Sequence, residues 1–435
     1  MDTQTISFWP SSQLKRGTDA TLTADRPKVW TNMEVILKVT ERCNINCTYC
    51  YFFNMTNRDY ESHPPYLNPS TIEEIGRFLA NAAKAANVQN LQIDFHGGEP
   101  LMMKKERFDA MCVSLYLALA DVPMVRLVMQ TNAILIDDEW IDIFAKHRIG
   151  IGISVDGPKD MHDAYRVDHK GKGTYDDTID GLRKLQTAVW EGRLGAEGIG
   201  LICVIDPDRD AREVFAHFVD VLGMQHLHFL LPMVDHDTVA PDANDKMGRF
   251  LCELFDVWVE RGERTISIRY MRRLFSLLLG GGAHFDTREN ERGSSIAYTI
   301  ASNGDIGPSD DLRNTFPLLF RTGSNVATST LDQYTAHRAI QTHGEAISAR
   351  HSDCVSCCWG KICDGGDLIG NEAFRYSRRT GFANKSVYCE SIKELLTHMA
   401  VHAVRSGVDF AHIAKVLVNE NAPDETSNAM PSMEG

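Results

Sequence analysis

The residues best suited to chemistry in this chain are two groups of cysteines. The first group has the spacing Cys-x3-Cys-x2-Cys and consists of Cys43, Cys47 and Cys50. The second group lies far along the chain and consists of Cys354, Cys357, Cys358, Cys363 and Cys389. The first residues show no basic stretch followed by an apolar run, so we expect a cytoplasmic protein in a reducing compartment. There, clustered cysteines indicate metal or redox chemistry rather than disulfides.

The first group could hold an iron–sulfur cluster. Three thiolates on one short loop can bind three irons of a four-iron cluster and leave the fourth iron open to a substrate's amine and carboxylate. The alternative is a zinc knuckle completed by a remote ligand, although zinc sites more often use Cys-x2-Cys pairs. The remaining cysteines stand alone in apolar patterns and are expected to be buried small hydrophobic residues: Cys112, Cys203 and Cys252.

The composition indicates an ordinary globular protein. The chain has 435 residues, of which 43% are hydrophobic and 24% charged, and this length predicts two or three structural units. Its 45 basic and 59 acidic residues give a net charge of −14, which argues against a nucleic-acid partner. No apolar run approaches about 20 residues, so neither a membrane-spanning helix nor a membrane partner is expected.

Six short apolar runs alternate with helical periods between residues 30 and 265. The runs predict strands at residues 33–39, 91–95, 125–129, 149–155, 199–205 and 226–231. Helices are predicted between them, one with a capping box at Ser70 and Glu73 and another starting at Asp206-Pro207. The other helices are predicted at residues 105–120, 137–147, 175–190 and 244–262. This alternation predicts an α/β fold: a parallel sheet forming a partial (β/α)6 TIM-like barrel, because six units are too few for a closed eight-stranded one.

The alternation stops after residue 265, which predicts a smaller C-terminal domain. A glycine run at residues 280–282 is expected to join the two parts. A hairpin is expected from residues 296–301 with a turn at Asn303-Gly304, and a helix over residues 391–405. The expected organisation is an N-terminal extension (1–29), the barrel (30–265), a cysteine-bearing domain (266–420) and a disordered tail (421–435).

Polar and glycine-rich turns follow several of the expected strands. They include Gly97-Gly98-Glu99-Pro100, Thr131-Asn132 and Ser154-Val155-Asp156-Gly157. The carboxyl ends of parallel strands meet at one edge of a sheet, where ligands usually bind. We therefore expect these turns and the first cysteine group to share one rim.

The cysteine spacing, the aromatic residue before Cys50 and the rim turns in this order resemble the radical S-adenosylmethionine (radical SAM) superfamily over about residues 30–235. The resemblance implies a 4Fe-4S cluster on the first cysteine group, with S-adenosylmethionine bound to it. It also implies that an external electron donor, a flavodoxin- or ferredoxin-like protein, drives reductive cleavage of this ligand. The resulting 5′-deoxyadenosyl radical would abstract a hydrogen atom from the substrate.

The resemblance also assigns residues to S-adenosylmethionine. Tyr49 would pack on the adenine, Ser154 would hold the ribose, and the Arg166 fork would bind the carboxylate. The Glu99 carboxylate would accept hydrogen bonds from the ammonium group, and the two glycines before it would let the backbone approach. Taken alone, an arginine in a polar loop is usually a solvated charge. The full expected set is Tyr49, Gly97, Gly98, Glu99, Asn132, Ser154, Arg166 and Val204.

The second cysteine group resembles the SPASM or twitch auxiliary-cluster domain of radical enzymes that modify peptides. The full pattern has seven cysteines for two clusters. Three of its positions are changed here: no cysteine lies between Arg288 and Ser294, and the other two positions hold Ser309 and Asp367. The resemblance implies that one cluster is lost, and that one auxiliary 4Fe-4S cluster remains on Cys354, Cys357, Cys363 and Cys389. A structural zinc site with four cysteine ligands is the alternative.

Asp310 directly follows Ser309, and the resemblance to sulfatase-maturating enzymes implies that it could act as a base. The alternative is a turn aspartate that accepts backbone hydrogen bonds.

The resemblance as a whole implies a maturase that abstracts a hydrogen atom from a ribosomally synthesised precursor peptide. Residues 363–366 and 384–389 resemble maturases that build cyclophane crosslinks, which predicts a carbon–carbon bond to an aromatic side chain. The alternatives are a sulfatase-maturating oxidase that forms formylglycine, and a non-catalytic iron–sulfur or zinc protein that senses redox state. Only 42 residues precede Cys43, too few for a peptide-recognition domain. The peptide is therefore expected to bind the barrel and the C-terminal domain, or a separate leader-peptide-binding protein.

Overall fold

The computed structural model describes residues 30–195, 198–280, 294–366 and 372–417. Several sequence predictions lie outside these residues: the N-terminal extension, the disordered tail, the second and third glycines of the 280–282 joint, and Asp367. Residues 288–293, where the first auxiliary cysteine is missing, also lie outside them.

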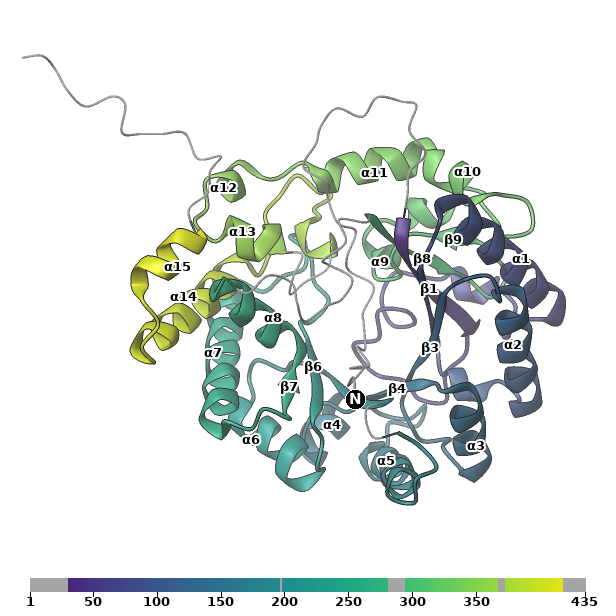
Figure 1. Ribbon diagram of the computed structural model, residues 1–435, viewed down its shortest axis with the longest axis horizontal. Coiled ribbons are helices and arrows are strands. Elements are labelled where there is room, and N and C mark those ends of the chain that lie inside the picture. Colours follow the sequence, from purple (N-terminus) through teal and green to yellow (C-terminus); the bar gives the residue numbers. More distant parts are fainter. Residues whose placement is uncertain (1–29, 196–197, 281–293, 367–371, 418–435) are drawn as a thin grey trace, which may run out of the picture.

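One sheet runs through the described residues, in the strand order β7-β6-β5-β4-β3-β2-β1-β8-β9. Neighbouring strands are parallel throughout, except for the antiparallel hairpin of β8 and β9. The strands are β1 (Trp30–Thr40), β2 (Asn90–Gly97), β3 (Met124–Thr131), β4 (Gly150–Ser154), β5 (Ile199–Val204), β6 (His226–Leu230), β7 (Ser267–Ile268), β8 (Ser294–Ile300) and β9 (Ile306–Gly307). In Figure 1 the sheet curves around a central space and the helices lie outside it. This confirms the expected α/β fold with a partial TIM-like barrel.

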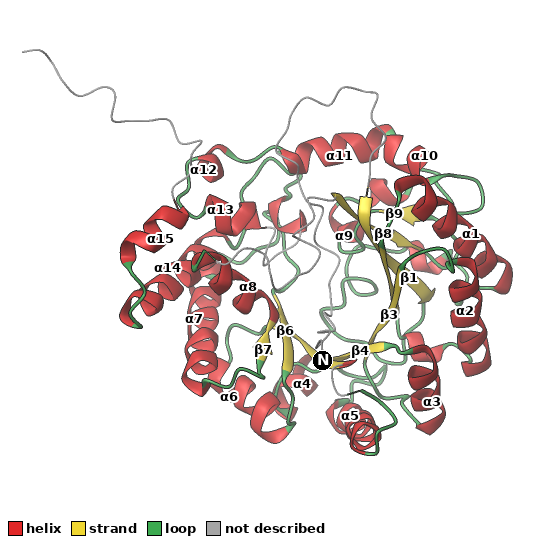
Figure 2. Cartoon of the chain, in the orientation of Figure 1, coloured by secondary structure: helices red, strands yellow, loops and turns green. Residues whose placement is uncertain are grey.

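The helices of the barrel pack their apolar faces against the outside of the sheet (Figure 2). They are α1 (Pro69–Ala86), α2 (Lys105–Ala118), α3 (Asp138–His147), α4 (Lys159–Tyr165), α5 (Tyr175–Trp190), α6 (Ala211–Ala216), α7 (Ala243–Arg261) and α8 (Arg269–Leu278). The core that they share with the sheet is continuous and includes the fully buried rings of Phe95, Phe108 and Phe144. Burying each of these aromatic side chains contributes about 1.5–3 kcal/mol to folding through the apolar area removed from water.

All six strands predicted from the sequence are present. The sheet is nevertheless longer than predicted, because β7 pairs with β6 and β8 pairs with β1. The sheet therefore continues past residue 265, where the sequence pattern had suggested a boundary. A two-residue strand such as β7 leaves no periodic pattern, and no local signal in β8 indicates that its partner lies about 260 residues earlier in the chain.

Two predicted helix starts were wrong. The N-cap of α1 is Asn68, whose side chain accepts a hydrogen bond from the backbone N–H of Thr71, so Ser70 lies inside the helix. The N-cap of α6 is Asp210 rather than Asp206. The Asp206 carboxylate instead accepts a hydrogen bond from the Tyr165 hydroxyl at 2.9 Å. Several Asx residues near one helix start compete for the same capping role, and the backbone path decides between them.

The C-terminal part consists of the β8–β9 hairpin and short helices. These are α9 (Leu312–Thr315), α10 (Leu331–Ala336), α11 (Arg338–Ser348), α12 (Ser352–Val355), α13 (Gly360–Cys363), α14 (Cys389–Arg405) and α15 (Phe410–Leu417). The predicted helix at residues 391–405 corresponds to α14, which packs against α7 of the barrel. The predicted hairpin turn is present, with Gly304 at φ +87°, a left-handed conformation that favours glycine. Within the described residues, no helix combines the length and apolarity needed to cross a lipid bilayer.

Candidate active site

The first cysteine group lies on the loop that follows β1, at the carboxyl end of the sheet. The turn after β2 fixes one side of this loop, because the backbone N–H groups of Gly98 and Glu99 donate to the carbonyls of Thr40 and Arg42 at 3.0 and 2.8 Å. The segment after α4 fixes the other side. There the N–H groups of Asn46 and Thr48 donate to the carbonyls of Val167 and Tyr165 at 2.7 and 2.9 Å. The loop is thus held by backbone contacts on both sides.

Gly98 is required for this contact. A Cβ at Gly98 would lie 2.0 Å from the carbonyl oxygen of Arg42 and 2.8 Å from the backbone nitrogen of Cys43. Separations this short cannot be relieved by a side-chain movement, because both neighbours are backbone atoms of the cysteine loop.

Gly98→Ala is therefore expected to displace the cysteine loop and to lower both thermal stability and iron binding at the first group. Overpacking of a close contact costs about 1–3 kcal/mol or more. Gly344→Ala is a matched control, because a Cβ there, within α11, meets no described atom within 4 Å. Gly98→Ala should have a lower melting temperature and a lower iron content than Gly344→Ala. Equal iron content in both would contradict the role of Gly98.

The three thiols of the first group are mostly shielded from water. Cys47 is buried, and Cys43 and Cys50 are half-buried. Burial raises the pKa of all three thiols, so their ionisation needs a positive group in the same place. Within the described residues, no three His, Cys, Asp or Glu side chains gather closely enough to hold a single metal ion. A metal ion or cluster bound by the three thiols would supply the positive charge that their ionisation needs.

A buried hydrogen-bond chain joins three residues beside the cysteine loop. The Arg166 Nη1 donates to the Tyr49 hydroxyl at 2.8 Å, and that hydroxyl donates to Oδ2 of Asp156 at 2.5 Å. Oδ1 of Asp156 accepts from the backbone N–H of Val204 at 3.1 Å. Arg166 is only 7% exposed, and its buried Nε makes no hydrogen bond to any of the described residues. A buried guanidinium donor without a partner is suited to an anionic ligand such as a carboxylate.

Asp156 was missed by the sequence analysis as a site residue. Burial raises its pKa, and the nearby Arg166 and the Tyr49 hydroxyl oppose that shift. It directly follows the Ser154-Val155 turn, so its place in that rim motif was the available signal.

Glu99 lies at the centre of the same rim and is almost fully buried. Its carboxylate accepts hydrogen bonds from the N–H of Leu101 at 3.1 Å, the Thr131 hydroxyl at 2.6 Å and the N–H of Asn132 at 2.8 Å. Burial raises the pKa of Glu99 to about 6, while these donors oppose the shift. The donors fix the carboxylate in place, and its remaining acceptor capacity suits a cationic ligand.

Asn132 and Ser154 complete the rim. The Asn132 side chain donates to Oδ1 of Asn44 at 2.8 Å and so connects the end of β3 to the cysteine loop. The Ser154 hydroxyl accepts from the Gln130 amide at 2.7 Å and has no contact with the Tyr49–Arg166 chain. Seven of the eight residues expected to bind S-adenosylmethionine lie at the ends of β1 to β5 or in the loops that follow them, and the eighth, Arg166, directly follows α4.

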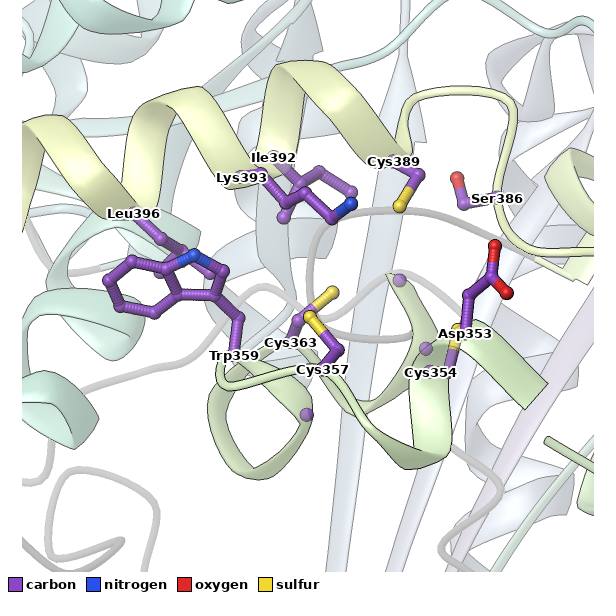
Figure 3. Close-up of a pocket in the computed structure, with 13 residues that line it drawn as sticks. Asp353, Cys354, Cys357, Trp359, Cys363, Ser386, Cys389, Ile392, Lys393 and Leu396 are labelled. Carbon is purple, nitrogen blue, oxygen red and sulfur yellow. The ribbon is translucent and has the colours of Figure 1, made fainter. Parts of the chain in front are cut away.

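The second cysteine group lines a pocket of about 450 Å³ that is partly open to solvent. Figure 3 shows the four thiols around it: Cys354 lies in α12, Cys357 in the turn between α12 and α13, Cys363 at the end of α13 and Cys389 at the start of α14. Burial raises the pKa of Cys363 to about 12. Cys358 is exposed and does not line the pocket, which fits a thiol without a ligand role.

Asp310 is almost fully buried, and its carboxylate contacts two cations and a tyrosine hydroxyl. Its Oδ1 accepts from Nε of Arg313 at 2.6 Å, its Oδ2 accepts from the Tyr51 hydroxyl at 2.6 Å, and Lys38 forms an ion pair with it. Burial alone would raise the pKa of Asp310, but Lys38 and Arg313 hold it below its ordinary value. As a base, Asp310 would have to release one of these partners first. Lys38, on β1, is a further residue that the sequence analysis missed.

The comparisons with known proteins agree with this geometry. Residues 37–216 match the family model of the radical SAM superfamily. The chain is 24% identical over 379 residues to a cysteine-type anaerobic sulfatase-maturating enzyme of Clostridium perfringens, covering 84% of this chain and 95% of that one. It is 22% identical over 409 residues to a serine-type anaerobic sulfatase-maturating enzyme of Bacteroides thetaiotaomicron, covering 89% and 92%.

The fold is also that of a solved relative. The structure described as native anSMEcpe with bound AdoMet superposes with a TM-score of 0.71 at 20% identity, covering 86% of this chain and 98% of that one. The matched segment contains the cysteine loop, the glycine turn and the ends of β1 to β5. The chain is therefore an enzyme of the radical SAM superfamily, whose members use a 4Fe-4S cluster together with S-adenosylmethionine.

Proposed function

We propose that this enzyme modifies a peptide or protein by abstracting a hydrogen atom from one of its residues. The observation that carries the proposal is the buried rim, where three thiols, a fixed carboxylate and an unpartnered guanidinium nitrogen lie beside one loop. The relatives that match most of this chain are named as sulfatase-maturating enzymes, which supports a peptide or protein substrate. A non-catalytic redox sensor would not need this rim.

The described residues fit the two cofactors. Cys43, Cys47 and Cys50 would bind the cluster, and Gly98 leaves the backbone room beside it. Arg166 would bind the carboxylate of S-adenosylmethionine through its free Nε, and Glu99 would bind the ammonium group. When bound and reduced, these cofactors supply an organic radical that removes a hydrogen atom from the substrate.

The chain's own residues hold and shield this site. Asp156 and Tyr49 keep the Arg166 side chain in one place, since each is linked to it through the same hydrogen-bond chain. The buried side chains of Glu99, Asn132 and Asp156 keep bulk water out of the rim. Exclusion of water prevents side reactions of a reactive intermediate.

For the modification itself we propose a side-chain crosslink of the cyclophane type in a ribosomally made precursor peptide. Support comes from Ser309, a buried serine at a position that holds a cysteine in the two-cluster pattern. A crosslink joins a side-chain carbon to an aromatic carbon: the organic radical would take one hydrogen atom, and the second hydrogen would leave as a proton and an electron, the electron passing to the proposed auxiliary cluster. The reduced, reconstituted enzyme should therefore make a product lighter by two hydrogen atoms with no aldehyde. Ample cofactor cleavage with an unchanged peptide mass would argue against it.

Formylglycine formation is the second candidate, favoured by the names of the matching relatives. The same experiment separates the two, because formylglycine carries an aldehyde that reacts with a hydrazide probe. From a serine the product also loses two hydrogen atoms, whereas from a cysteine it loses hydrogen sulfide and gains one oxygen. A probe-reactive product would therefore exclude the crosslink.

We also propose that the second cysteine group holds one auxiliary 4Fe-4S cluster with four thiolate ligands. The wild-type chain should then contain about eight irons, and Cys363→Ala should contain about four. Cys358→Ala is the matched control and should keep about eight, because Cys358 is exposed and does not line the pocket. Iron and sulfide analysis measures this. A wild-type chain with about four irons and one zinc would instead assign a structural zinc site.

The remaining partners are part of the same proposal. The cluster needs an external electron donor, for which a flavodoxin- or ferredoxin-like protein is proposed. The peptide could add as a strand to an edge of the sheet, or it could bind through a separate leader-peptide-binding protein. Pull-down of the enzyme by the precursor peptide alone distinguishes the two, because only the first mode needs no other protein.

A further inference from the structure

The segment that follows Cys50 is held by residues from the other end of the chain. Tyr51, the next residue, donates its hydroxyl to Asp310, and its carbonyl accepts from the side-chain amide of Asn314. The same Asn314 side chain accepts from the backbone N–H of Asn57 at 2.9 Å. Asp310 lies two residues before α9 and Asn314 lies within it, so one short helical turn of the C-terminal part holds both ends of residues 51–57.

The contact with Asp310 is part of a buried charge cluster. Lys38 is fully buried, and its Nζ lies 3.0 Å from Nδ1 of His96 and 4.3 Å from the centre of the Phe52 ring. Arg313 lies on the other side of Asp310, with its guanidinium 4.3 Å from the centre of the Phe320 ring. Asp310 therefore separates two buried cations. Such a carboxylate is costly to move, because Lys38 would lose its ion-pair partner and Arg313 would keep only the longer pair with Asp59 at 3.8 Å.

Both carboxylate oxygens of Asp310 already have partners. One oxygen accepts from Arg313, and the other accepts from Tyr51 and pairs with Lys38. A carboxylate in this state is a poor proton acceptor but a good anchor. The residue it anchors is directly bonded in sequence to Cys50, a proposed ligand of the cluster.

We infer that Asp310 is a positioning residue that acts through Tyr51 to set the place of Cys50, rather than a base that touches the substrate. This inference rests on the proposed function, because it needs a cluster at the first cysteine group. The two roles make different demands on the enzyme in the absence of peptide. A base has no task until a substrate is bound, whereas a positioning residue affects the cluster at all times.

The test uses the reconstituted full-length enzyme without any peptide. Asp310→Asn and Tyr51→Phe are compared with wild type by the electron paramagnetic resonance spectrum of the reduced cluster with S-adenosylmethionine, and by peptide-independent cofactor cleavage. Both variants should change the spectrum and lower the cleavage rate. Asp310→Asn should lower the rate by about tenfold. Tyr51→Phe should lower it less, because this variant loses only one charge-assisted hydrogen bond. The double variant should be no worse than Asp310→Asn, because the two residues act as one unit.

Tyr60→Phe is the matched control. Tyr60 lies three residues after this segment, its ring packs near the Phe53 ring, and no hydrogen bond of its hydroxyl is found among the described residues. It should behave as wild type. Tyr51→Phe also guards against misfolding, because it leaves Lys38, Asp310 and Arg313 in place and removes one hydroxyl. The iron content at the second cysteine group reports whether each variant is folded.

Two results would overturn the inference. Variants with wild-type spectra and cleavage that fail only in product formation would make Asp310 a base. A wild-type Tyr51→Phe beside a defective Asp310→Asn would show that Asp310 does not act through Tyr51. A wild-type chain that shows no reduced-cluster signal would overturn the proposed function, and this inference with it.

Discussion

Cys43→Ala is expected to abolish cleavage of S-adenosylmethionine and to remove the iron bound at the first cysteine group. The loss of activity should exceed about a hundredfold, because even residues one step removed from a metal are worth about 10–100-fold. The backbone of this loop is held on both sides by the turn after β2 and the segment after α4. Neighbouring side chains therefore cannot easily move in to replace a missing thiolate. Iron analysis and the yield of 5′-deoxyadenosine measure the result.

Cys112→Ala is the control for this prediction. Cys112 is fully buried in α2 and far from both cysteine groups in the sequence. Its replacement should lower the free energy of unfolding by about 1 kcal/mol and leave iron content and cofactor cleavage unchanged. If Cys43→Ala and Cys112→Ala behaved alike, the first group would have no special role as a ligand set.

Arg166→Met is expected to weaken the binding of S-adenosylmethionine by at least about a hundredfold. The buried Nε of Arg166 makes no hydrogen bond within the part of the chain that the structure describes, so its hydrogen-bonding capacity is available to a ligand carboxylate. A charge-assisted bond in a buried site contributes about 3 kcal/mol when one partner is removed. The substitution also leaves Asp156 buried without its neighbouring cation, so the pKa of Asp156 should rise further above its ordinary value. Equilibrium dialysis with the iron-loaded protein measures the dissociation constant.

Two further variants test the assignment of the ligand carboxylate to Arg166. Arg166→Lys keeps the charge but loses the planar fork, so its affinity should lie between those of wild type and Arg166→Met. Arg209→Met removes an arginine that pairs with Asp160 and Asp206 near the surface, and it should change the affinity less than twofold, about the size expected for an exposed ion pair. An unchanged affinity in Arg166→Met would assign the carboxylate to another residue.

The barrel was largely predictable because its signals are local. Each of the first six strands is a short apolar run, and the rim turns follow those runs directly in the sequence, so the carboxyl-edge rule brings them together. Glu99 and Asn132, predicted separately, in fact share a hydrogen bond. Helix starts were less predictable, since Asn68 and Ser70 are both good caps and only the backbone path favours Asn68.

The long-range parts of the site could not be predicted. Lys38 lies near the end of β1, where a lysine gives no sign that its partner is Asp310, more than 270 positions later. Asp156 was missed because a polar residue after a strand is common, and its link to Tyr49 and Arg166 appears only when three loops converge. The contacts of Asp310 were likewise unpredictable, because the sequence left it open between a base and a turn aspartate and gave no sign of its ion pair with Lys38 or its hydrogen bond from Tyr51.

The pairing of β8 with β1 has a consequence for how this protein can be divided. β1 carries the first cysteine loop and lies inside the sheet, with β2 on one side and β8 on the other. A fragment ending at residue 265 would lack β8 and turn β1, which is buried along nearly its whole length, into an open edge. Exposed apolar edge strands pair with other chains and aggregate. The catalytic barrel is therefore not a detachable module: its last structural strand is supplied by the region that bears the second cysteine group.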